Sequence, residues 1–280
     1  EQKDNDEAVK IAQTADTIVL TLGESTLEAG EAGAKTKLTL PENQLHLIDR
    51  LSKLGKKIVL ITISGRPLVL TNVVDKVDAI IEAWFPGTEG GHAIADILYG
   101  KVNPSGRLTM TFPYAVGQEP IYYNHLSTGR PQVGSQHVGR FVSKYLDAPV
   151  TPLYPFGYGL SYGSSEYKDL KLSSHKLTRN SSIKVKLTVK NTGGYDRREI
   201  VQLYIHDQVA SIVQPVKRLI DFKAVKVPRG QTKEVEFEIK ASELTFYDNL
   251  GRDYLENGDF DVFVGKSSAD CLIETVELSE

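Results

Sequence analysis

The sequence predicts two regions of different class, a mostly parallel α/β sandwich followed by an all-β sandwich of immunoglobulin-like type. Up to about residue 115, apolar runs suited to buried strands alternate with apolar stripes of helical spacing. After about residue 164 the apolar period falls to two, and turn sequences separate the runs. The length of 280 residues suits two domains, since domains cluster at roughly 100–150 residues.

The first region contains runs of consecutive apolar residues, the pattern of strands that are buried on both faces of a sheet. Three such runs predict strands, at residues 17–23, 58–63 and 79–85. Helical stripes flank them, at residues 8–15, 42–54, 68–74 and 91–99. Because strands and helices alternate, we expect a parallel sheet with helices on both faces.

Periodicity disappears from residue 103 to about residue 162, where Gly, Pro and aromatic residues are frequent. A flexible linker would be rich in Ser and Gly and poor in aromatic residues, so this segment is expected to pack on something. The predicted limits are 1–115 for the α/β domain, truncated at its start, 116–163 for the connecting segment and 164–280 for the all-β domain.

The all-β region shows apolar residues that alternate with polar ones in four runs, at residues 183–189, 201–205, 235–239 and 260–264. Turn sequences lie between them, at residues 191–194, 228–230 and 257–258. Short strands with such punctuation predict an antiparallel sandwich.

Composition excludes several classes of function. The net charge of −3, from 33 basic and 36 acidic residues, is far from the basic balance that nucleic-acid binding favours. No run approaches the roughly 20 apolar residues that a membrane span needs. A single cysteine and six histidines without ligand spacing predict neither an intramolecular disulfide nor a metal site, and no cofactor motif is present. The chain starts without an initiator Met or a signal peptide, and its compartment stays open.

Two glycine motifs have structural interpretations. Residues 159–163 fit the G-x-S-x-G nucleophile elbow, but neither a buried strand before Ser161 nor a helix after it is predicted. Residues 87–91 lie between a strand and a helix and match no phosphate-binding pattern, which favours a tight turn.

Three glutamates follow the first predicted strand, at Glu24, Glu28 and Glu31. In a parallel sheet the loops after the strands meet at the carboxyl edge, where ligands gather. A carboxylate there can act as an acid or base when neighbours tune its pKa. From the residues alone, a solvated loop glutamate is the more frequent outcome.

This loop and several further motifs, in order along the chain, resemble glycoside hydrolase family 3. In the first half they are the glutamate loop with the segment 35–41 and Gln44, and the stretches 84–91, 103–108, 122–131 and 154–162. In the all-β region, 201–204 and 210–217 are similar to the family's fibronectin type III-like module. The resemblance covers essentially the whole chain and is closest to bacterial β-glucosidases of the periplasmic kind.

The resemblance implies the site residues. Glu31 falls on the general acid/base of a retaining hydrolase, with Glu28 as the rival carboxylate. Arg130 and Tyr145 fall on a segment that in such enzymes touches the sugar on the leaving side. Lys35 stands where the family often has Arg, and Lys37 where it often has Asp. The nucleophilic Asp of the family belongs to a (β/α)₈ barrel, for which this chain has neither the length nor the motifs.

The resemblance therefore implies the C-terminal part of a β-glucosidase that removes terminal β-D-glucose, with the barrel of the same enzyme as its partner. This chain alone is predicted to be inactive. Two alternatives stay open: a non-catalytic carbohydrate-binding or scaffolding module, and a family 3 β-xylosidase or N-acetylglucosaminidase. A homodimer, and a periplasmic, secreted or cytoplasmic location in a bacterium, also stay open, while nucleic acid and membrane are not expected partners.

Overall fold

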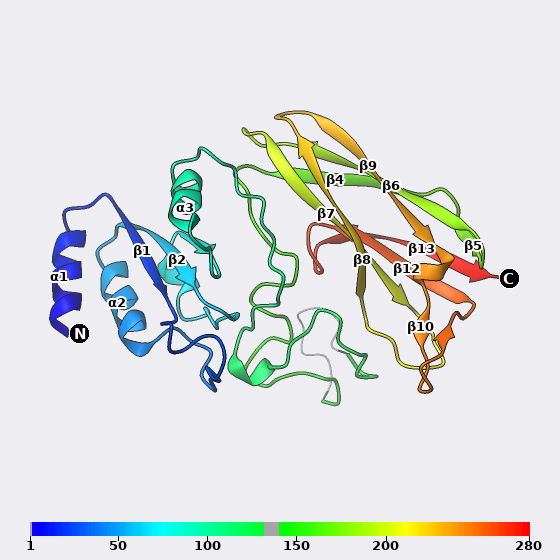
Figure 1. Ribbon diagram of the computed structural model, residues 1–280, viewed down its shortest axis with the longest axis horizontal. Helices are drawn as coiled ribbons and strands as arrows, with labels where there is room; N and C mark the ends of the chain where they lie inside the picture. Colours follow the sequence, from blue (N-terminus) through cyan, green and yellow to red (C-terminus); the bar gives the residue numbers. More distant parts are fainter. Residues whose placement is uncertain (1, 132–139) are drawn as a thin grey trace. The chain divides into compact units, whose positions relative to one another are not determined.

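The computed structural model describes residues 2–131 and 140–280, and in it the chain forms two compact units (Figure 1). The first unit comprises Glu1–Lys101, Phe112–Pro120 and Asp147–Tyr154. The second comprises Val102–Thr111, Ile121–Leu146 and Pro155–Glu280. Each unit therefore takes part of the aperiodic segment in addition to one of the two regular regions.

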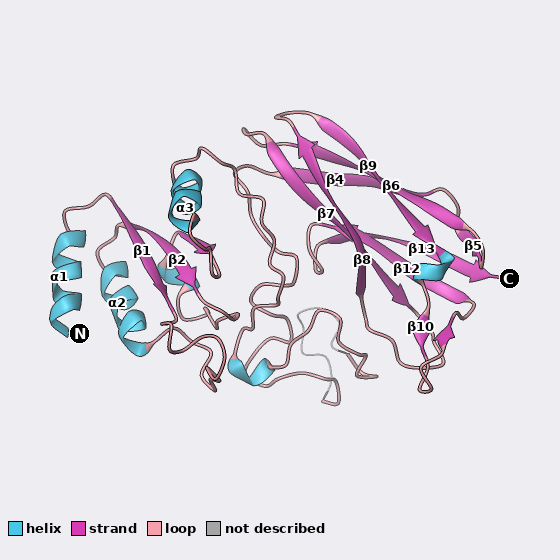
Figure 2. Ribbon diagram, in the orientation of Figure 1, coloured by secondary structure: helices cyan, strands magenta, loops and turns pink. Residues whose placement is uncertain are grey.

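The first unit is built on a three-stranded parallel sheet with the order β1-β2-β3. Its strands are β1 (Thr17–Gly23), β2 (Lys57–Ile63) and β3 (Ala79–Glu82). Its helices are α1 (Gln2–Ala12), α2 (Glu42–Ser52) and α3 (Gly90–Leu98). The parallel α/β architecture expected from the alternating pattern is confirmed. Figure 2 shows helices and strands alternating in this unit.

Helices α1 and α2 cover one face of this sheet because their apolar stripes face Ile18 of β1 and Ile58 of β2. Ala12 of α1 and Leu51 of α2 are buried in the same cluster. Figure 1 shows α3 on the opposite side of the strands from α1 and α2. Pro41 is the residue before the first turn of α2 and has an extended backbone, with ψ 146°. Gly100 follows α3 with φ 70°, the left-handed conformation usual after a helix.

The helix expected over 68–74 is wrong. Val69 is extended instead: its N–H donates to the Leu38 carbonyl at 2.6 Å, and it forms an isolated parallel bridge with Thr39. Leu68, Val69 and Leu70 are consecutive and all buried, whereas a surface helix buries only one stripe. A short 3-10 turn, Val74–Lys76, follows.

The aperiodic segment packs through its aromatic side chains, as expected. In the first unit, the Phe112 ring lies edge-on to Trp84 at 5.7 Å and to Tyr154 at 6.3 Å between centroids. In the second unit, Tyr123 stacks on Phe156 at 4.3 Å. The segment contains one short 3-10 helix, Val116–Gln118, among its described residues.

The second unit is a sandwich of a five-stranded sheet, ordered β5-β13-β12-β7-β8, and a three-stranded sheet, ordered β4-β6-β9. The pairs are antiparallel except β13–β5, which confirms the immunoglobulin-like class. The strands of these two sheets are β4 (Ser165–Leu172), β5 (Lys176–Thr178), β6 (Ser182–Asn191), β7 (Arg197–Asp207), β8 (Arg218–Val227), β9 (Thr232–Lys240), β12 (Gly258–Gly265) and β13 (Cys271–Ser279). A hairpin of β10 (Phe246–Tyr247) and β11 (Asp253–Tyr254) accompanies them.

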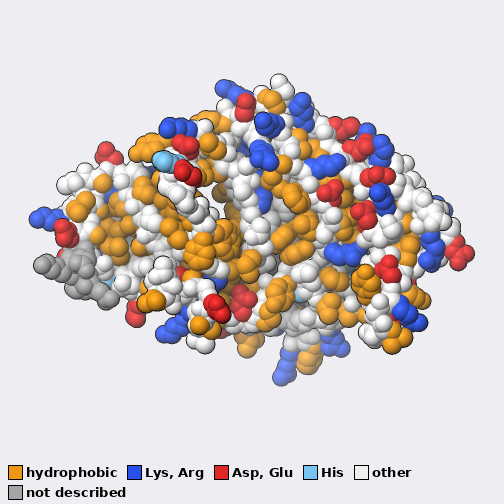
Figure 3. Space-filling model, viewed as in Figure 1, with side chains coloured by type: hydrophobic (Ala, Val, Ile, Leu, Met, Phe, Trp, Pro, Cys, Tyr) orange, Lys and Arg blue, Asp and Glu red, His pale blue; other side chains and the backbone are white. Residues whose placement is uncertain are grey.

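The alternating residues predicted for four strands all point into the sandwich core. They are the buried Ile183, Val185, Leu187 and Val189, Val201, Leu203 and Ile205, Val235, Phe237 and Ile239, and Phe260, Val262 and Val264. The outer face carries ion pairs between β6 and β9, such as Lys184–Glu236 at 2.9 Å. On the face seen in Figure 3, basic and acidic side chains are interspersed and form no continuous basic area.

No helix within the described residues is long and apolar enough to cross a membrane.

Candidate active site

The loop that carries the three glutamates leaves β1 at the carboxyl edge of the parallel sheet. Gly23 ends the strand at φ 149°, and a Cβ atom there would lie 1.9 Å from the Ile63 carbonyl oxygen of β2, so only glycine fits. The Gln44 side chain, on α2, accepts from the Gly23 N–H and donates to the Gly23 carbonyl, both at 2.9 Å. The start of the loop is therefore tied to β2 and α2.

Glu24 is the buried member of the three, with a side chain 0% exposed. Its Oε1 lies 3.1 Å from Arg66 Nε and 3.4 Å from Lys35 Nζ. A buried carboxylate is costly unless it is paired, and two cations supply that pairing here. Glu24 is therefore placed to organise the loop rather than to reach a substrate.

Glu28 is held by the loop itself. Its Oε1 accepts from Lys35 Nζ at 2.9 Å, and its Oε2 accepts from the Ser25 N–H at 2.9 Å. The hydrogen bond from Lys35 and then those from Ser25 lower the pKa of Glu28 from its usual 4.5 to about 2. Glu28 is thus ionised at neutral pH and poorly suited to donate a proton.

Glu31 is exposed, and it lies between two residues in left-handed conformations, Gly30 at φ 92° and Ala32 at φ 61°. The Gly33 N–H donates to the Gly30 carbonyl at 3.1 Å, which closes a tight turn around Glu31. Among the described residues, no side chain pairs with the Glu31 carboxylate. A non-glycine residue at positive φ stores strain, and such strain is common at functional sites.

Arg66, which sequence reasoning missed, joins these parts. Its guanidinium contacts Glu24 and also donates from Nη2 to two loop carbonyls, Glu28 at 2.6 Å and Gly33 at 2.8 Å. The available signal was its position directly after a buried strand, in the run Ser64-Gly65-Arg66.

The third strand contributes a partly buried carboxyl, that of Glu82, at the same edge. Glu82 accepts from the Thr62 hydroxyl at 2.6 Å and from the Trp84 N–H at 3.0 Å, and burial raises its pKa. The strand expected to run to residue 85 stops at Glu82, because Trp84 adopts φ 51°, which no strand can continue. The Phe85 ring then lies over Gly65, where a Cβ would be 2.9 Å from Cε2.

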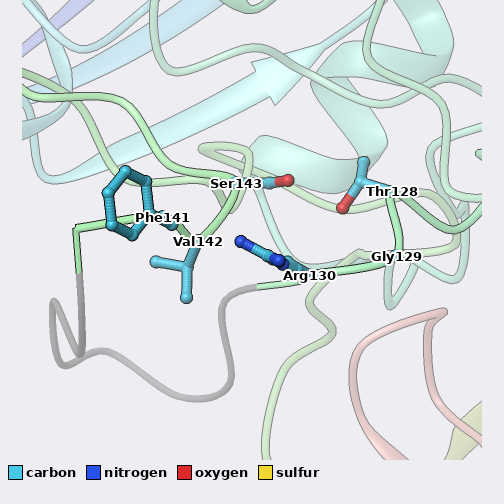
Figure 4. Close-up of a pocket in the computed structure, with 6 residues that line it drawn as sticks. All are labelled: Thr128, Gly129, Arg130, Phe141, Val142 and Ser143. Carbon is cyan, nitrogen blue, oxygen red and sulfur yellow. The ribbon is translucent and has the colours of Figure 1, made fainter.

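Arg130 and Tyr145, the other two candidates, belong to the second unit. The Arg130 carbonyl accepts from the Ser143 N–H at 2.8 Å, which brings Arg130 beside residues 141–143. Figure 4 shows its guanidinium extending along a shallow pocket that is lined by Thr128, Gly129, Arg130, Phe141, Val142 and Ser143. Tyr145 is 39% exposed and is not among the lining residues.

Comparison with protein families matches both regions of the chain. A model described as the glycosyl hydrolase family 3 C-terminal domain matches residues 1–162. A model of a fibronectin type III-like domain matches residues 199–268.

Individual relatives are longer than this chain. Periplasmic beta-glucosidase of Salmonella typhimurium is 43% identical over 264 residues, covering 94% of this chain and 34% of the relative. A beta-xylosidase of Formosa agariphila is 35% identical over 273 residues, 98% of this chain and 37% of the relative. The structure of β-glucosidase from Listeria innocua in complex with gluconolactone superposes with a TM-score of 0.95 at 41% identity, covering 100% of this chain and 39% of that one. The chain thus spans about a third of the length of these curated relatives.

Proposed function

We propose that this chain, which belongs to glycosyl hydrolase family 3, is the C-terminal portion of a retaining β-glucosidase. In this proposal the chain supplies the general acid/base, Glu31. An N-terminal (β/α)₈ barrel of the same enzyme supplies the nucleophilic Asp and most of the sugar pocket. The substrates are glycosides with a terminal, non-reducing β-D-glucosyl residue, and the reaction needs no cofactor.

The observation that carries the choice of Glu31 is the contrast among the three loop carboxylates. An acid/base must hold a proton in one step and release it in another, and it must reach the substrate. Glu24 is buried between two cations, and Glu28 is held ionised by Lys35. Within the described residues, Glu31 alone of the three is exposed and unpaired, which supports it over its rival.

The proposed chemistry has two steps. Protonated Glu31 donates its proton to the glycosidic oxygen while the barrel carboxylate attacks the anomeric carbon. The bond between that carbon and the glycosidic oxygen breaks, the aglycone leaves as an alcohol, and a glycosyl ester forms. Glu31, now a carboxylate, then takes a proton from water, which attacks the ester and releases glucose with retained configuration. The two carboxyl groups must lie about 5–5.5 Å apart, and this chain supplies one of them.

Two further residues complete the proposal. Arg130, with five donors in a fixed fork, is placed beside a pocket and suits the recognition of sugar hydroxyls. Tyr145 offers a partly exposed aromatic face with a hydroxyl. We also keep 1–115, 116–163 and 164–280 as our proposed domain limits.

A family 3 β-xylosidase is the second candidate, because the Formosa relative of that name is 35% identical over nearly the whole chain. Glucose and xylose differ by the C6 hydroxymethyl group, and the pocket that would contact it is assigned here to the barrel. Hydrolysis of paired aryl β-glucosides and β-xylosides by the complete enzyme separates the two.

The test of Glu31 is a leaving-group series in the complete enzyme. For Glu31→Ala we expect kcat/KM to fall by about 10²–10⁴ for alkyl β-glucosides, whose leaving groups need protonation, and to change little for 2,4-dinitrophenyl β-glucoside. The 280-residue chain alone should hydrolyse neither substrate, since one carboxylate cannot complete the double displacement. An equal loss on all leaving groups, or turnover by the purified chain, would overturn the proposal.

A further inference from the structure

We propose that Arg66 is the positioning residue of the acid/base loop, fixing Glu31 through the backbone on both sides of it. This inference rests on the proposed role of Glu31. Arg66 itself does not touch the reacting atoms in this account, and its effect passes through the loop.

The guanidinium reaches the loop at two points that bracket Glu31. Nη2 donates to the Glu28 carbonyl at 2.6 Å and to the Gly33 carbonyl at 2.8 Å. A single nitrogen therefore joins the chain three residues before Glu31 to the chain two residues after it. These bonds close the base of the turn, while Glu31 stays exposed.

The base of the turn is narrow because Gly33 lacks a side chain. A Cβ atom at Gly33 would lie 3.0 Å from the Glu28 carbonyl oxygen and 3.1 Å from the Gly30 carbonyl oxygen. Both bracketing carbonyls can thus point toward one guanidinium. The hydrogen bonds from Arg66 and the close approach of the Gly33 backbone to the Glu28 carbonyl both stabilise this narrow turn.

Arg66 is anchored to the sheet on its other side. Its Nε lies 3.1 Å from Oε1 of the buried Glu24, and the hydroxyl of the fully buried Ser64 donates to the Arg66 carbonyl at 2.9 Å. Glu24 directly follows β1 and Ser64 directly follows β2. The contacts of Arg66 therefore connect the loop to the ends of two strands of the sheet.

Lys35 makes a different connection. It joins Glu24 to Glu28, and its Nζ contacts only these carboxylates among the described residues. Arg66 instead combines a carboxylate contact through Nε with two carbonyl contacts through Nη2. Only a planar fork presents donors in two directions at fixed spacing, so a lysine at position 66 could keep the charge but not the full set of contacts.

The first arm of the test measures the loop itself by hydrogen–deuterium exchange in the 280-residue chain. Arg66→Lys should make the amides of residues 28–34 exchange about tenfold faster while those of β2 stay unchanged. The double variant Glu24→Gln/Arg66→Gln, which leaves no buried charge unpaired, should do the same. Arg50→Lys is the matched control, because Arg50 pairs with Asp6 at 2.6 Å between α2 and α1, away from the loop. Unchanged exchange of residues 28–34 in both Arg66 variants overturns the proposal.

The second arm measures the consequence for catalysis in the complete enzyme. Since a misplacement of about 1 Å can cost about 100-fold, Arg66→Lys should lower kcat for alkyl β-glucosides by about 10- to 100-fold with KM little changed. The first step with 2,4-dinitrophenyl β-glucoside should keep its rate, a selectivity that general unfolding would not produce. Equal losses on both substrates, or none, overturn the positioning role.

The Glu31 variants distinguish failure of this inference from failure of the proposed function. If Glu31→Ala shows the leaving-group dependence and Arg66→Lys does not, Glu31 keeps its role and Arg66 loses the one proposed for it. If Glu31→Ala lacks that dependence, the proposed function fails first, and the positioning role fails with it.

Discussion

Glu24, Glu28 and Glu31 lie on one loop, yet each carboxylate has different surroundings. Burial and two cations surround Glu24, a lysine and a backbone N–H hold Glu28, and Glu31 is exposed between two left-handed residues. The chemistry available to each follows from its neighbours rather than from its residue type. At this scale, therefore, the loop separates two paired carboxylates, Glu24 and Glu28, from an exposed one, Glu31.

The pH dependence of stability should report the pairing of Glu28. Its folded pKa of about 2 lies below the ordinary 4.5, so its pairing stabilises the fold above pH 4.5, and this contribution is lost as pH falls toward 2. We expect Glu28→Gln to be less stable than the wild type at pH 7, with a difference that vanishes at the acid end. Urea unfolding followed by the fluorescence of Trp84, the single tryptophan of the chain, measures this in the first unit.

Glu7→Gln is the control for that experiment, since Glu7 is an exposed glutamate on α1 of the same unit. It should not reproduce the pH-dependent difference. A difference for Glu28→Gln that stayed constant from pH 7 to pH 2 would contradict the assigned pairing with Lys35.

At the scale of elements, the second unit contains a buried ionic cluster centred on β7. Glu199 is 0% exposed, and its Oε1 accepts from Arg197 Nε at 2.5 Å. Its Oε2 accepts from the Tyr167 hydroxyl at 3.1 Å and lies 3.5 Å from Arg107 Nη2. The hydrogen bond and charge of Arg197 lower the pKa of Glu199 although burial opposes this. The cluster ties the segment around Arg107 to β4 and β7.

Removal of the central carboxylate should strongly destabilise this unit. Glu199→Ala leaves Arg197 and Arg107 buried without their partner, and breaking a buried pair costs about 3–5 kcal/mol. We expect that loss of unfolding free energy in urea titrations followed by far-ultraviolet circular dichroism. Arg198→Ala, an exposed neighbour on the same strand, is the control and should change stability by about 0.5 kcal/mol or less. A loss below about 1 kcal/mol for Glu199→Ala would show that the cluster does not hold the unit together.

Elements with a clear apolar period could be predicted from the sequence, and the others could not. Strands β1 and β2 and four strands of the sandwich match their runs closely. Strand β8 was missed because few of its side chains are buried and its alternation is weak. The expected helix over 68–74 failed because Leu68, Val69 and Leu70 are consecutive and all buried, which leaves no period there to separate helix from extended chain.

At the scale of the whole molecule, the two fold classes and the family were predicted correctly, since changes of period and long ordered motifs are properties of the sequence itself. The support of the candidate site was not predictable in the same way. Arg66 and Glu24 are 42 positions apart, and nothing local to either residue indicates the contact. Likewise, the pairing of Glu28 with Lys35 depends on a loop conformation that residue types alone do not specify. Glu31, Arg130 and Tyr145 remain predictions.

The most direct test of the central claim, that Glu31 is the acid/base, is rescue by azide in the complete enzyme. In Glu31→Ala acting on 2,4-dinitrophenyl β-glucoside, the glycosyl ester should accumulate because no base remains to activate water. Azide needs no deprotonation, so its addition should restore turnover and yield β-glucosyl azide, whereas Glu28→Ala should form none. Azide rescue of Glu28→Ala but not of Glu31→Ala, or of neither variant, would contradict the assignment.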